Sequence, residues 1–445
     1  MDYNISKYMV VQALNEDEML LYSTLSTSIL TMENDMFKTI FIDHDFAKYG
    51  DECSSLCDMG FLFEGEKDSQ LKELFKVRQE IVESDHGITG ITITPSMDCN
   101  ARCFYCFEHG AKKGTMSLET ADDVARFLID RCTDKELYIA WFGGEPLLAP
   151  NIIDRITSKL VDAGIKVEST ITTNGILLNA EIVEKFKDWH VTRIQITLDG
   201  LGEEYNRIKN YTIDLDNPFE RIMENIELSI SSGISVHLRV NYKSTDYDTV
   251  SKTMNYLHDR FGHYDKLYLY GAPLDLPHIK GYSEFDENEG DIFLNVMNDS
   301  LRRGYENDEL DFSSLRVAED YNKALGELML APFPANCYMV NRNRYVIDDA
   351  GLLYKCQRHL GKAQFSCGNV KDGAVFNEIY KYYVTANLHD ENCKNCNILP
   401  ICQGGCNASR LLNGDKFACP PSKTIIEKLV MKYYQYLTDE ENSQN

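Results

Sequence analysis

Three cysteines lie close together in the segment SMDCNARCFYCFEHG, which covers residues 96–110. Cys99, Cys103 and Cys106 form the pattern C-x-x-x-C-x-x-C. Thiolates are soft ligands that suit iron–sulfur clusters or zinc. A structural zinc site takes four protein ligands, usually as two pairs, whereas this loop supplies three. The spacing therefore indicates a cubane cluster in which one iron stays open to a substrate or cofactor. Half of a zinc site, or three unrelated thiols, is the alternative.

A second group of cysteines follows in the C-terminal part of the chain. Four of them have the spacing C-x2-C-x5-C-x3-C, and three others flank this run. The seven are Cys337, Cys356, Cys393, Cys396, Cys402, Cys406 and Cys419. In a reducing compartment, clustered cysteines bind metals more often than they form disulfides. The group therefore predicts metal sites, and a zinc ribbon would use only four of its members.

Composition and charge exclude several classes of function. The chain has 445 residues, of which 43% are hydrophobic and 26% charged, and its net charge is −25. We expect two or three domains at this length. No long Lys/Arg cluster occurs, which argues against a nucleic-acid partner. No apolar run is long enough to cross a membrane, and the N-terminus lacks the pattern of a secretory signal. A cytoplasmic protein without a membrane partner is expected.

The elements that must position the first three cysteines alternate between strand and helix patterns. Six such repeats run from residue 87 to about residue 275, and most of the strands end in Gly-rich turns. This alternation predicts an α/β fold with a partial (β/α)6 parallel barrel. Ligands of such sheets bind at the C-terminal ends of the strands. The three-cysteine loop lies at such an end, as do Gly143–Pro146, Thr172–Gly175 and Thr197–Gly200.

The remaining segments predict the domain organisation. Residues 1–84 form a small N-terminal α/β unit, and residues 85–275 form the barrel. Residues 276–336 are an acidic bridging segment. Residues 337–423 form a Cys-rich iron–sulfur domain held by metal more than by an apolar core. Residues 424–445 form a C-terminal helix with a polar tail.

The three-cysteine loop resembles the signature of radical S-adenosylmethionine (radical SAM) enzymes, with Tyr105 as its aromatic residue. The resemblance implies that S-adenosylmethionine chelates the open iron of a 4Fe–4S cluster. Its reductive cleavage then gives a 5′-deoxyadenosyl radical that abstracts a hydrogen atom. Gly143, Gly144 and Glu145 match the family's G-G-E motif, which contacts the methionine amino group. Asn174 and Thr197 lie where the family contacts the ribose or carboxylate. Arg207 and Arg239 are candidates for the carboxylate, with ordinary salt bridges as the alternative.

The seven C-terminal cysteines resemble the SPASM extension of peptide-modifying radical SAM enzymes. The resemblance implies two auxiliary 4Fe–4S clusters, and therefore three clusters in all. Cys393, Cys396, Cys402 and Cys419 would hold the outer cluster, and Cys337, Cys356 and Cys406 the inner one.

The sequence departs from sulfatase-maturing relatives at two positions. Asn343 replaces an eighth cysteine, so the inner cluster either keeps an open iron or recruits Cys367. Gln357 replaces an Asp that acts as their presumed base, which disfavours sulfatase maturation.

The expected function is therefore a maturase that oxidatively modifies a ribosomally made peptide, by a thioether or carbon–carbon cross-link. A sulfatase-maturing (formylglycine-generating) enzyme and a non-catalytic iron–sulfur electron carrier are the alternatives. A precursor peptide or protein and an electron donor such as flavodoxin or ferredoxin are the expected partners. Residues 1–84 loosely resemble an element that captures a leader peptide as an added strand. A plain cap on the barrel remains the other interpretation of this unit.

Overall fold

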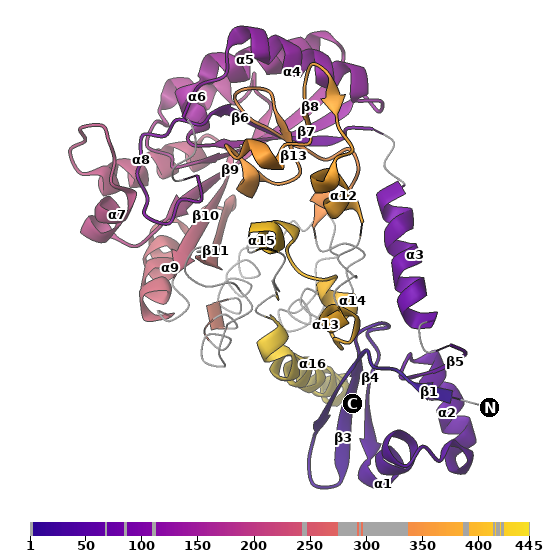
Figure 1. Cartoon of the computed structure of the whole chain (residues 1–445). Helices are drawn as coiled ribbons and strands as arrows, with labels where there is room; N and C mark the ends of the chain where they lie inside the picture. Colours follow the sequence, from indigo (N-terminus) through magenta and orange to yellow (C-terminus); the bar gives the residue numbers. More distant parts are fainter. Residues whose placement is uncertain are drawn as a thin grey trace.

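The computed structural model describes residues 3–66, 69–83, 87–108, 113–242, 247–274, 292, 295–296, 337–385, 391–412, 414, 419 and 422–444. Figure 1 shows the whole chain, with a helix-covered sheet at one end and a small N-terminal unit at the other. The predicted bridging segment, residues 276–336, lies outside the described residues except for 292 and 295–296. No helix in the described part of the chain combines the length and apolar character needed to cross a membrane.

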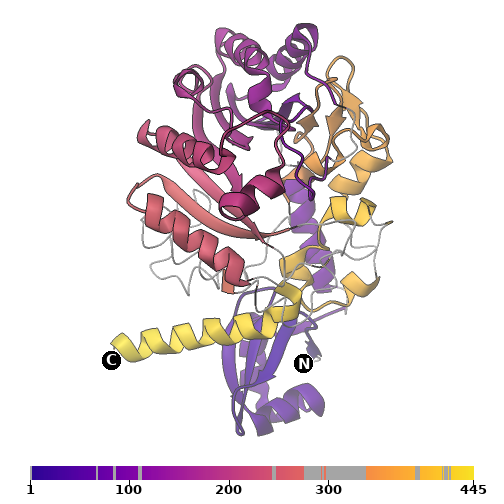
Figure 2. The same ribbon diagram turned by 90° about the vertical axis from the view of Figure 1, so that its left-hand side faces the viewer.

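Six parallel strands form the main sheet in the order in which they occur along the chain. They are β6 (Gly90–Ser96), β7 (Glu136–Gly143), β8 (Lys166–Thr173), β9 (Val191–Leu198), β10 (Ser235–Tyr242) and β11 (Leu267–Pro273). The connecting helices lie on the outer face of this curved sheet (Figure 2). They are α4 (Leu118–Arg131), α5 (Pro150–Asp162), α6 (Ala180–Lys185), α7 (Gly202–Lys209), α8 (Pro218–Ser231) and α9 (Tyr247–Phe261). The predicted partial (β/α)6 barrel is confirmed.

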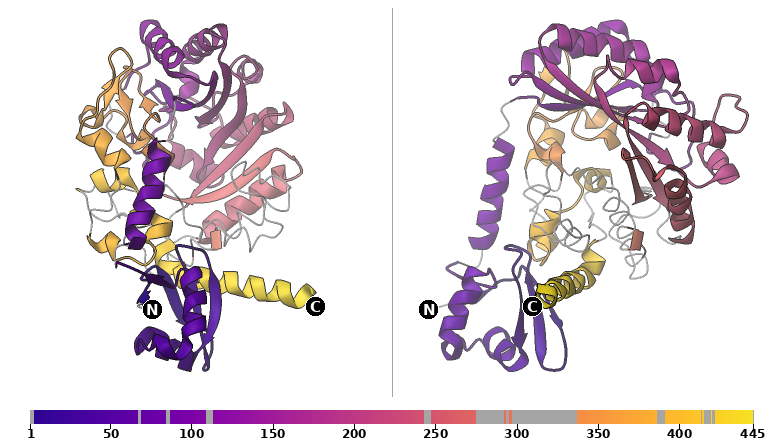
Figure 3. Two further views of the ribbon diagram at one scale, coloured as in Figure 1. Left: turned by 90° about the vertical axis from the view of Figure 1, so that its right-hand side faces the viewer. Right: turned by 180° about the vertical axis from the view of Figure 1, so that it is seen from behind.

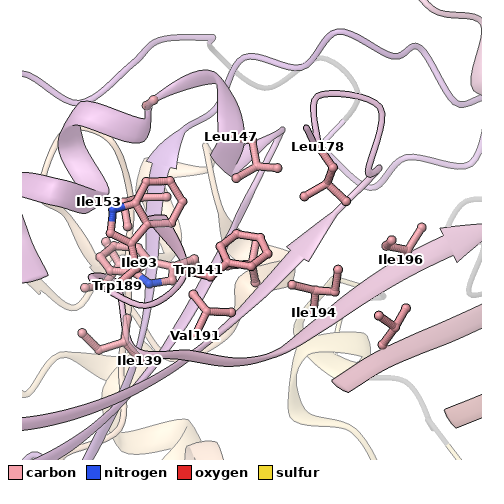
Figure 4. Packing of buried hydrophobic residues seen from close by; sticks show 14 of the residues in the cluster. Ile93, Ile139, Trp141, Leu147, Ile153, Leu178, Trp189, Val191, Ile194 and Ile196 are labelled. Carbon is pink, nitrogen blue, oxygen red and sulfur yellow. The ribbon is translucent and has the colours of Figure 1, made fainter. Parts of the chain in front are cut away.

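The strands alternate between two environments because successive side chains point to opposite faces. On β9, Ile194, Ile196 and Leu198 are completely buried under the helices, while the residues between them face the inside of the curve. Figure 4 shows Trp141 and Trp189 among the isoleucines of this outer core. Each fully buried Ile or Leu contributes on the order of 1.5–3 kcal/mol to folding. The large apolar core therefore lies outside the barrel, and the inside is left for polar side chains.

The Cys-rich region extends the barrel sheet. Strand β12 (Val346–Ile347) pairs in parallel with β6, and β13 (Leu353–Tyr354) pairs antiparallel with β12, so the sheet has eight strands. The hairpin of β14 (Gly368–Asn369) and β15 (Gly373–Ala374) follows. The remaining helices are α12 (Glu378–Val384), α13 (Glu391–Lys394), α14 (Leu399–Cys402), α15 (Asn407–Leu412) and α16 (Ser422–Gln444). The edge strand β6 of the barrel is thus closed by the C-terminal domain.

The N-terminal unit contains a three-stranded antiparallel sheet, as expected of a small α/β unit. It is formed by β2 (Met9–Ala13), β3 (Glu18–Ser23) and β4 (Ile29–Glu33). Strand β1 (Tyr3–Ile5) pairs with β5 (Leu62–Glu64), and the helices are α1 (Asn34–Phe37), α2 (Gly50–Asp58) and α3 (Ser69–Glu83). Helix α3 runs from this unit toward the barrel (Figure 3).

The N-terminal unit packs against the Cys-rich domain through an apolar cluster. Val10, Leu20 and Tyr22 contact Ile398 and Ile401, together with the apolar face of α16. Two hydrogen bonds connect Asn397 to the unit: Thr24 Oγ1 donates to the Asn397 carbonyl at 2.6 Å, and Asn397 Nδ2 donates to the Met9 carbonyl at 3.1 Å. The unit is therefore attached to the predicted cluster domain.

Candidate active site

The loop that carries Cys99, Cys103 and Cys106 follows β6 and is held by backbone hydrogen bonds from two sides. On one side it contacts the turn after β7, and on the other the end of α7. The bonds run from Gly144 N to Ser96 O (3.1 Å), Glu145 N to Asp98 O (2.8 Å), Arg102 N to Lys209 O (2.8 Å) and Thr212 N to Asn100 O (2.8 Å). The loop is therefore positioned by the turn after β7 on one side and by the end of α7 with the residues that follow it on the other.

The three cysteines of this loop are free and partly buried. Burial raises the pKa of the Cys99 thiol to about 12 and that of Cys106 to about 11, and the neighbouring thiolates act in the same direction. At neutral pH the Cys99 and Cys106 thiols are therefore protonated in the metal-free chain, and their binding to a metal would release protons. Three sulfur donors in one short loop fit an iron–sulfur cluster. Among the described residues, no three His, Cys, Asp or Glu side chains already stand together as a metal-binding group.

Gly143 and Gly144 let the turn after β7 approach this loop. Gly143 has a φ of +115°, and a Cβ there would lie 2.6 Å from the carbonyl oxygen of Ser96. A Cβ on Gly144 would lie 2.3 Å from the carbonyl oxygen of Asp98. Both contacts are with backbone, which cannot move aside without moving the loop. The two glycines are therefore required for the observed geometry.

The Glu145 carboxylate joins the ends of β7 and β8. It is completely buried, and burial raises its pKa. Its Oε1 accepts hydrogen bonds from Leu147 N (3.0 Å) and Thr173 Oγ1 (2.8 Å), and its Oε2 accepts one from Asn174 N (2.8 Å). Both oxygens are thus used to position the protein. The predicted contact of Glu145 with a methionine amino group stays a prediction.

Asn174 is placed beside the first cysteine by this arrangement. Its Nδ2 donates to Asn100 Oδ1 at 2.7 Å and lies 3.9 Å from Cys99 Sγ. Three buried polar atoms around the loop have no hydrogen-bond partner among the described residues: Thr94 Oγ1, Asn100 Nδ2 and Asp199 Oδ1. Unpaired buried polar groups are costly, so they fit a site that a polar ligand completes.

Tyr105 belongs to a buried polar network. Its hydroxyl donates to Asp199 Oδ2 at 2.5 Å, and Lys209 Nζ forms an ion pair with the same oxygen at 2.8 Å. Burial raises the pKa of the Tyr105 phenol well above its usual value, so the hydroxyl stays protonated and acts as the donor. Burial disfavours the charged form of Lys209, but the surrounding acidic groups, Asp199 first among them and then Tyr105, together outweigh it and hold the Lys209 pKa well above its ordinary value.

A cavity of about 620 Å³ occupies the inside of the barrel below the loop. Tyr105, Thr197 and Arg239 line it, which brings three predicted cofactor residues together. Arg239 Nε donates to Asn241 Oδ1 at 2.9 Å. Gln357, from the Cys-rich domain, lines the same cavity.

Arg207, a further predicted cofactor residue, is not among the described residues that line this cavity. Its side chain is 74% exposed, lies 4.0 Å from Glu204, and lines a second cavity of about 320 Å³ that also contacts Tyr105.

The C-terminal cysteines form two groups. In the first, the pKa of Cys356 is raised to about 12, mainly by burial and also by the nearby Cys406 and Cys337. In the second, the pKa of Cys402 is raised to about 12, mainly by burial and also by the nearby Cys419, Cys393 and Cys396. The groups have the same members as the two expected ligand sets, and their binding of clusters stays a prediction.

Cys367 is buried in the outer core of the barrel. Its Sγ lies 3.4 Å from the Leu353 carbonyl oxygen. Burial raises its pKa to about 11, and neither Cys337, Cys356 nor Cys406 contributes to that shift.

Four residues in or beside these cavities did not stand out in the sequence. Asp199 lies inside the predicted T-L-D-G turn, so its position offered a signal. Lys209 and Arg344 offered none, because each approaches the site only through the folding of distant segments, and Arg193 offered only the alternation of its strand.

Residues 93–257 match the Radical SAM superfamily. The chain is 26% identical over 370 residues to the cysteine-type anaerobic sulfatase-maturating enzyme of Clostridium novyi (strain NT), covering 76% of this chain and 94% of that protein. It is 23% identical over 485 residues to the radical SAM cyclopropyl synthase TigE of Paramaledivibacter caminithermalis, covering 98% of each. The family match confirms the resemblance inferred from the three-cysteine loop.

Two solved structures share the fold. Native anSMEcpe with bound AdoMet superposes with a TM-score of 0.62 and 18% identity, covering 80% of this chain and 100% of that one. Streptococcus suis SuiB bound to precursor peptide SuiA gives a TM-score of 0.52 and 16% identity, covering 92% and 97%.

Proposed function

We propose that this chain, which contains a radical SAM domain at residues 93–257, is a peptide maturase that oxidatively modifies a ribosomally made peptide. The observation that carries the proposal is the position of the three-cysteine loop (called the three-thiol loop below) at the mouth of the barrel cavity. Its backbone is held by hydrogen bonds from the turn after β7 and from the end of α7, as a preorganised site requires.

In this proposal Cys99, Cys103 and Cys106 hold a 4Fe–4S cluster at the open end of the cavity. Tyr105, Asn174, Thr197 and Arg239 hold S-adenosylmethionine beside it, with Gly143 and Gly144 giving the backbone access. When bound, these groups supply a 5′-deoxyadenosyl radical. The barrel wall and the C-terminal domain exclude water from the space where that radical meets the substrate.

The cavity lining favours oxidative cross-linking over formylglycine formation. Gln357 lies in the cavity at the position where the sulfatase maturases have their presumed base, and the described lining residues include no Asp or Glu. An amide cannot take up a proton as a carboxylate does. Sulfatase maturation remains the second candidate, because the 26% identical relative is an anaerobic sulfatase-maturating enzyme.

We assign the two C-terminal cysteine groups to auxiliary 4Fe–4S clusters. Cys337, Cys356 and Cys406 would hold the inner one, and Cys393, Cys396, Cys402 and Cys419 the outer one. When bound, these clusters would accept the electron that the oxidised substrate gives up. An electron donor such as flavodoxin or ferredoxin would supply the electron that the cluster at the three-cysteine loop needs.

The N-terminal unit is suited to peptide capture. Strand β3 is the central strand of its sheet, and α16 covers β2 through a hydrogen bond from Gln12 Nε2 to the Glu427 carbonyl (3.1 Å). In the described part of the chain, β4 pairs only with β3. We assign the other edge of β4 to the leader segment of the substrate peptide, because an extended peptide can add there as a strand.

The test is anaerobic reconstitution followed by chemical analysis. The wild-type chain is expected to hold about twelve irons, and to release 5′-deoxyadenosine when reduced with S-adenosylmethionine. Replacing Cys99, Cys103 and Cys106 together by Ala should remove about four irons and abolish the product. Cys57→Ala is the control, because this thiol lies in the N-terminal unit, and it should change neither quantity.

Three results would contradict the proposal. Release of 5′-deoxyadenosine by the triple variant would show that the loop is not needed for the reaction. If the iron-loaded wild type released no 5′-deoxyadenosine, an electron carrier would be favoured. Zinc in place of iron and sulfide would exclude iron–sulfur clusters. With a Cys-containing precursor peptide, mass spectrometry separates a cross-link, which retains the sulfur, from formylglycine, which loses it.

A further inference from the structure

The barrel cavity contains three guanidinium groups. Arg193 comes from β9, Arg239 from β10 and Arg344 from the segment before β12. No Asp or Glu is among the described lining residues, and no carboxylate of the described chain lies within 4.0 Å of these three side chains. Cations without an acidic partner are unexpected in a chain with a net charge of −25.

Two of the three arginines lie at the end of the cavity away from the three-thiol loop. Arg239 pairs with Thr197 near the C-terminal end of β9, whereas Arg193 pairs with Ser235 at the first residue of β10. Four residues therefore separate the two levels along the strands, or about 13 Å. Arg344 also lies at the end of the cavity away from the three-cysteine loop, beside Thr89 and Gly90 at the start of β6.

The far end of the cavity is built to hold these cations in place. A Cβ on Gly90 would lie 1.5 Å from Arg344 Nη1, so a side chain at this position would displace the guanidinium from where it lies. Arg344 Nη2 donates to Thr89 Oγ1 at 2.9 Å. Arg193 Nη2 donates to the Tyr138 hydroxyl at 2.8 Å. Among the described residues, neutral partners thus orient both guanidiniums, and no carboxylate compensates their charge.

We infer that the far end of the cavity binds a carboxylate of the substrate peptide, supplied by a Glu or Asp side chain. This inference rests on the proposed function and adds a substrate class to it. A guanidinium binds a carboxylate by charge-assisted and often bidentate hydrogen bonds. Because the walls are protein, the field of two cations is focused in the cavity rather than screened by water. The acidic residue would thus anchor the peptide while a neighbouring residue faces the three-thiol loop.

The first experiment needs no variant. Saturation-transfer NMR on the anaerobically reconstituted chain compares three capped probes: acetyl-Gly-Glu-Gly-amide, acetyl-Gly-Gln-Gly-amide, and acetyl-Gly-Gln-Gly with a free C-terminal carboxylate. The Glu peptide should bind about tenfold more tightly than the Gln amide, as expected for a charge-assisted pair. Equal affinities would overturn the inference. Preference for the free C-terminus over the Glu side chain would overturn the choice of side chain.

The second experiment locates the site. Arg193→Gln and Arg344→Gln should each reduce the preference for the Glu peptide about fivefold, and Arg193→Lys should restore part of it. Arg126→Gln is the matched control, because it removes the same charge from an exposed side chain on α4 and should leave the preference unchanged. An unchanged preference in both cavity variants, with a wild-type circular dichroism spectrum, would overturn the assignment.

Failure of this inference is distinguishable from failure of the proposed function. If wild-type protein releases 5′-deoxyadenosine but does not distinguish the Glu and Gln peptides, only the carboxylate site is wrong. If it releases none, the proposed function is wrong whatever the peptides do.

Discussion

Lys209 and Asp199 form an ion pair of 2.8 Å in which each side chain is only 3% exposed. The same Asp199 oxygen accepts the Tyr105 hydroxyl, and the Lys209 carbonyl accepts the backbone N–H of Arg102. One residue at the end of α7 therefore holds both the side chain and the backbone of the three-cysteine loop. The position of this loop depends on a buried charge pair whose members lie 94 and 104 residues from Tyr105 in sequence.

Replacing Lys209 by Met should destabilise the protein strongly. The substitution leaves the Asp199 carboxylate buried without a cation, which costs roughly 3–5 kcal/mol. Urea unfolding followed by circular dichroism measures the loss. Lys166→Met is the control, because its pair with Glu136 is exposed and contributes under about 1 kcal/mol. Equal effects of the two substitutions would show that the buried pair has no special role.

Gly144→Ala should reduce the iron retained by the three-cysteine loop. Its Cβ would meet the Asp98 carbonyl oxygen at 2.3 Å, so the loop or the turn after β7 must shift. Gly50→Ala is the control, since a Cβ there meets nothing within 4 Å and Gly50 begins a helix. The control should be neutral or stabilising by about 0.5–1 kcal/mol. The iron retained by each variant is measured after gel filtration. A full iron content in Gly144→Ala would contradict the steric argument.

Cys367→Ser should leave the iron content unchanged. The Cys367 thiol is buried in the outer core and bonds the Leu353 carbonyl oxygen, a contact that a hydroxyl can retain. Cys356→Ser is the comparison, because Cys356 belongs to the group with Cys337 and Cys406 and should lose iron. A loss of iron in Cys367→Ser, without loss of stability, would show that the inner cluster recruits this residue.

His237 should make stability depend on pH. Burial, with a contribution from Arg193, lowers its pKa from 6.5 to about 4. The unfolded chain therefore binds a proton near pH 6.5 that the folded chain binds only near pH 4. Above pH 6.5 the imidazole is neutral in both states, and the free energy of unfolding is at its full value. As the pH falls from 6.5 to 4, protonation of the unfolded chain lowers the free energy of unfolding by up to about 3 kcal/mol.

Urea unfolding at several pH values measures this dependence. His237→Gln should flatten the slope between pH 6.5 and 4. Tyr268→Phe, which keeps the imidazole and the neighbouring ring, should retain the wild-type slope. If the free energy of unfolding had the same pH dependence in wild type and His237→Gln, His237 would not be its cause.

Local patterns along the chain were enough to predict the barrel and the sheet edge at which its ligand is expected. Alternating strand and helix patterns determine a parallel sheet, and Gly-rich turns mark the ends of its strands, because periodicity and glycine are local properties. The cysteine spacings predicted two groups for the same reason. The ligand sets within the C-terminal group followed only from the family resemblance.

Only the tertiary structure decided which charges enter the cavity. Arg193 lies on a strand whose alternation shows its face but not its partner, and Arg344 comes from a segment far along the chain that joins the sheet beside β6. Likewise, Lys209 reads as an ordinary basic residue at a helix end until Asp199 and Tyr105 are brought to it. Such pairings depend on long-range packing and burial, which no local pattern encodes.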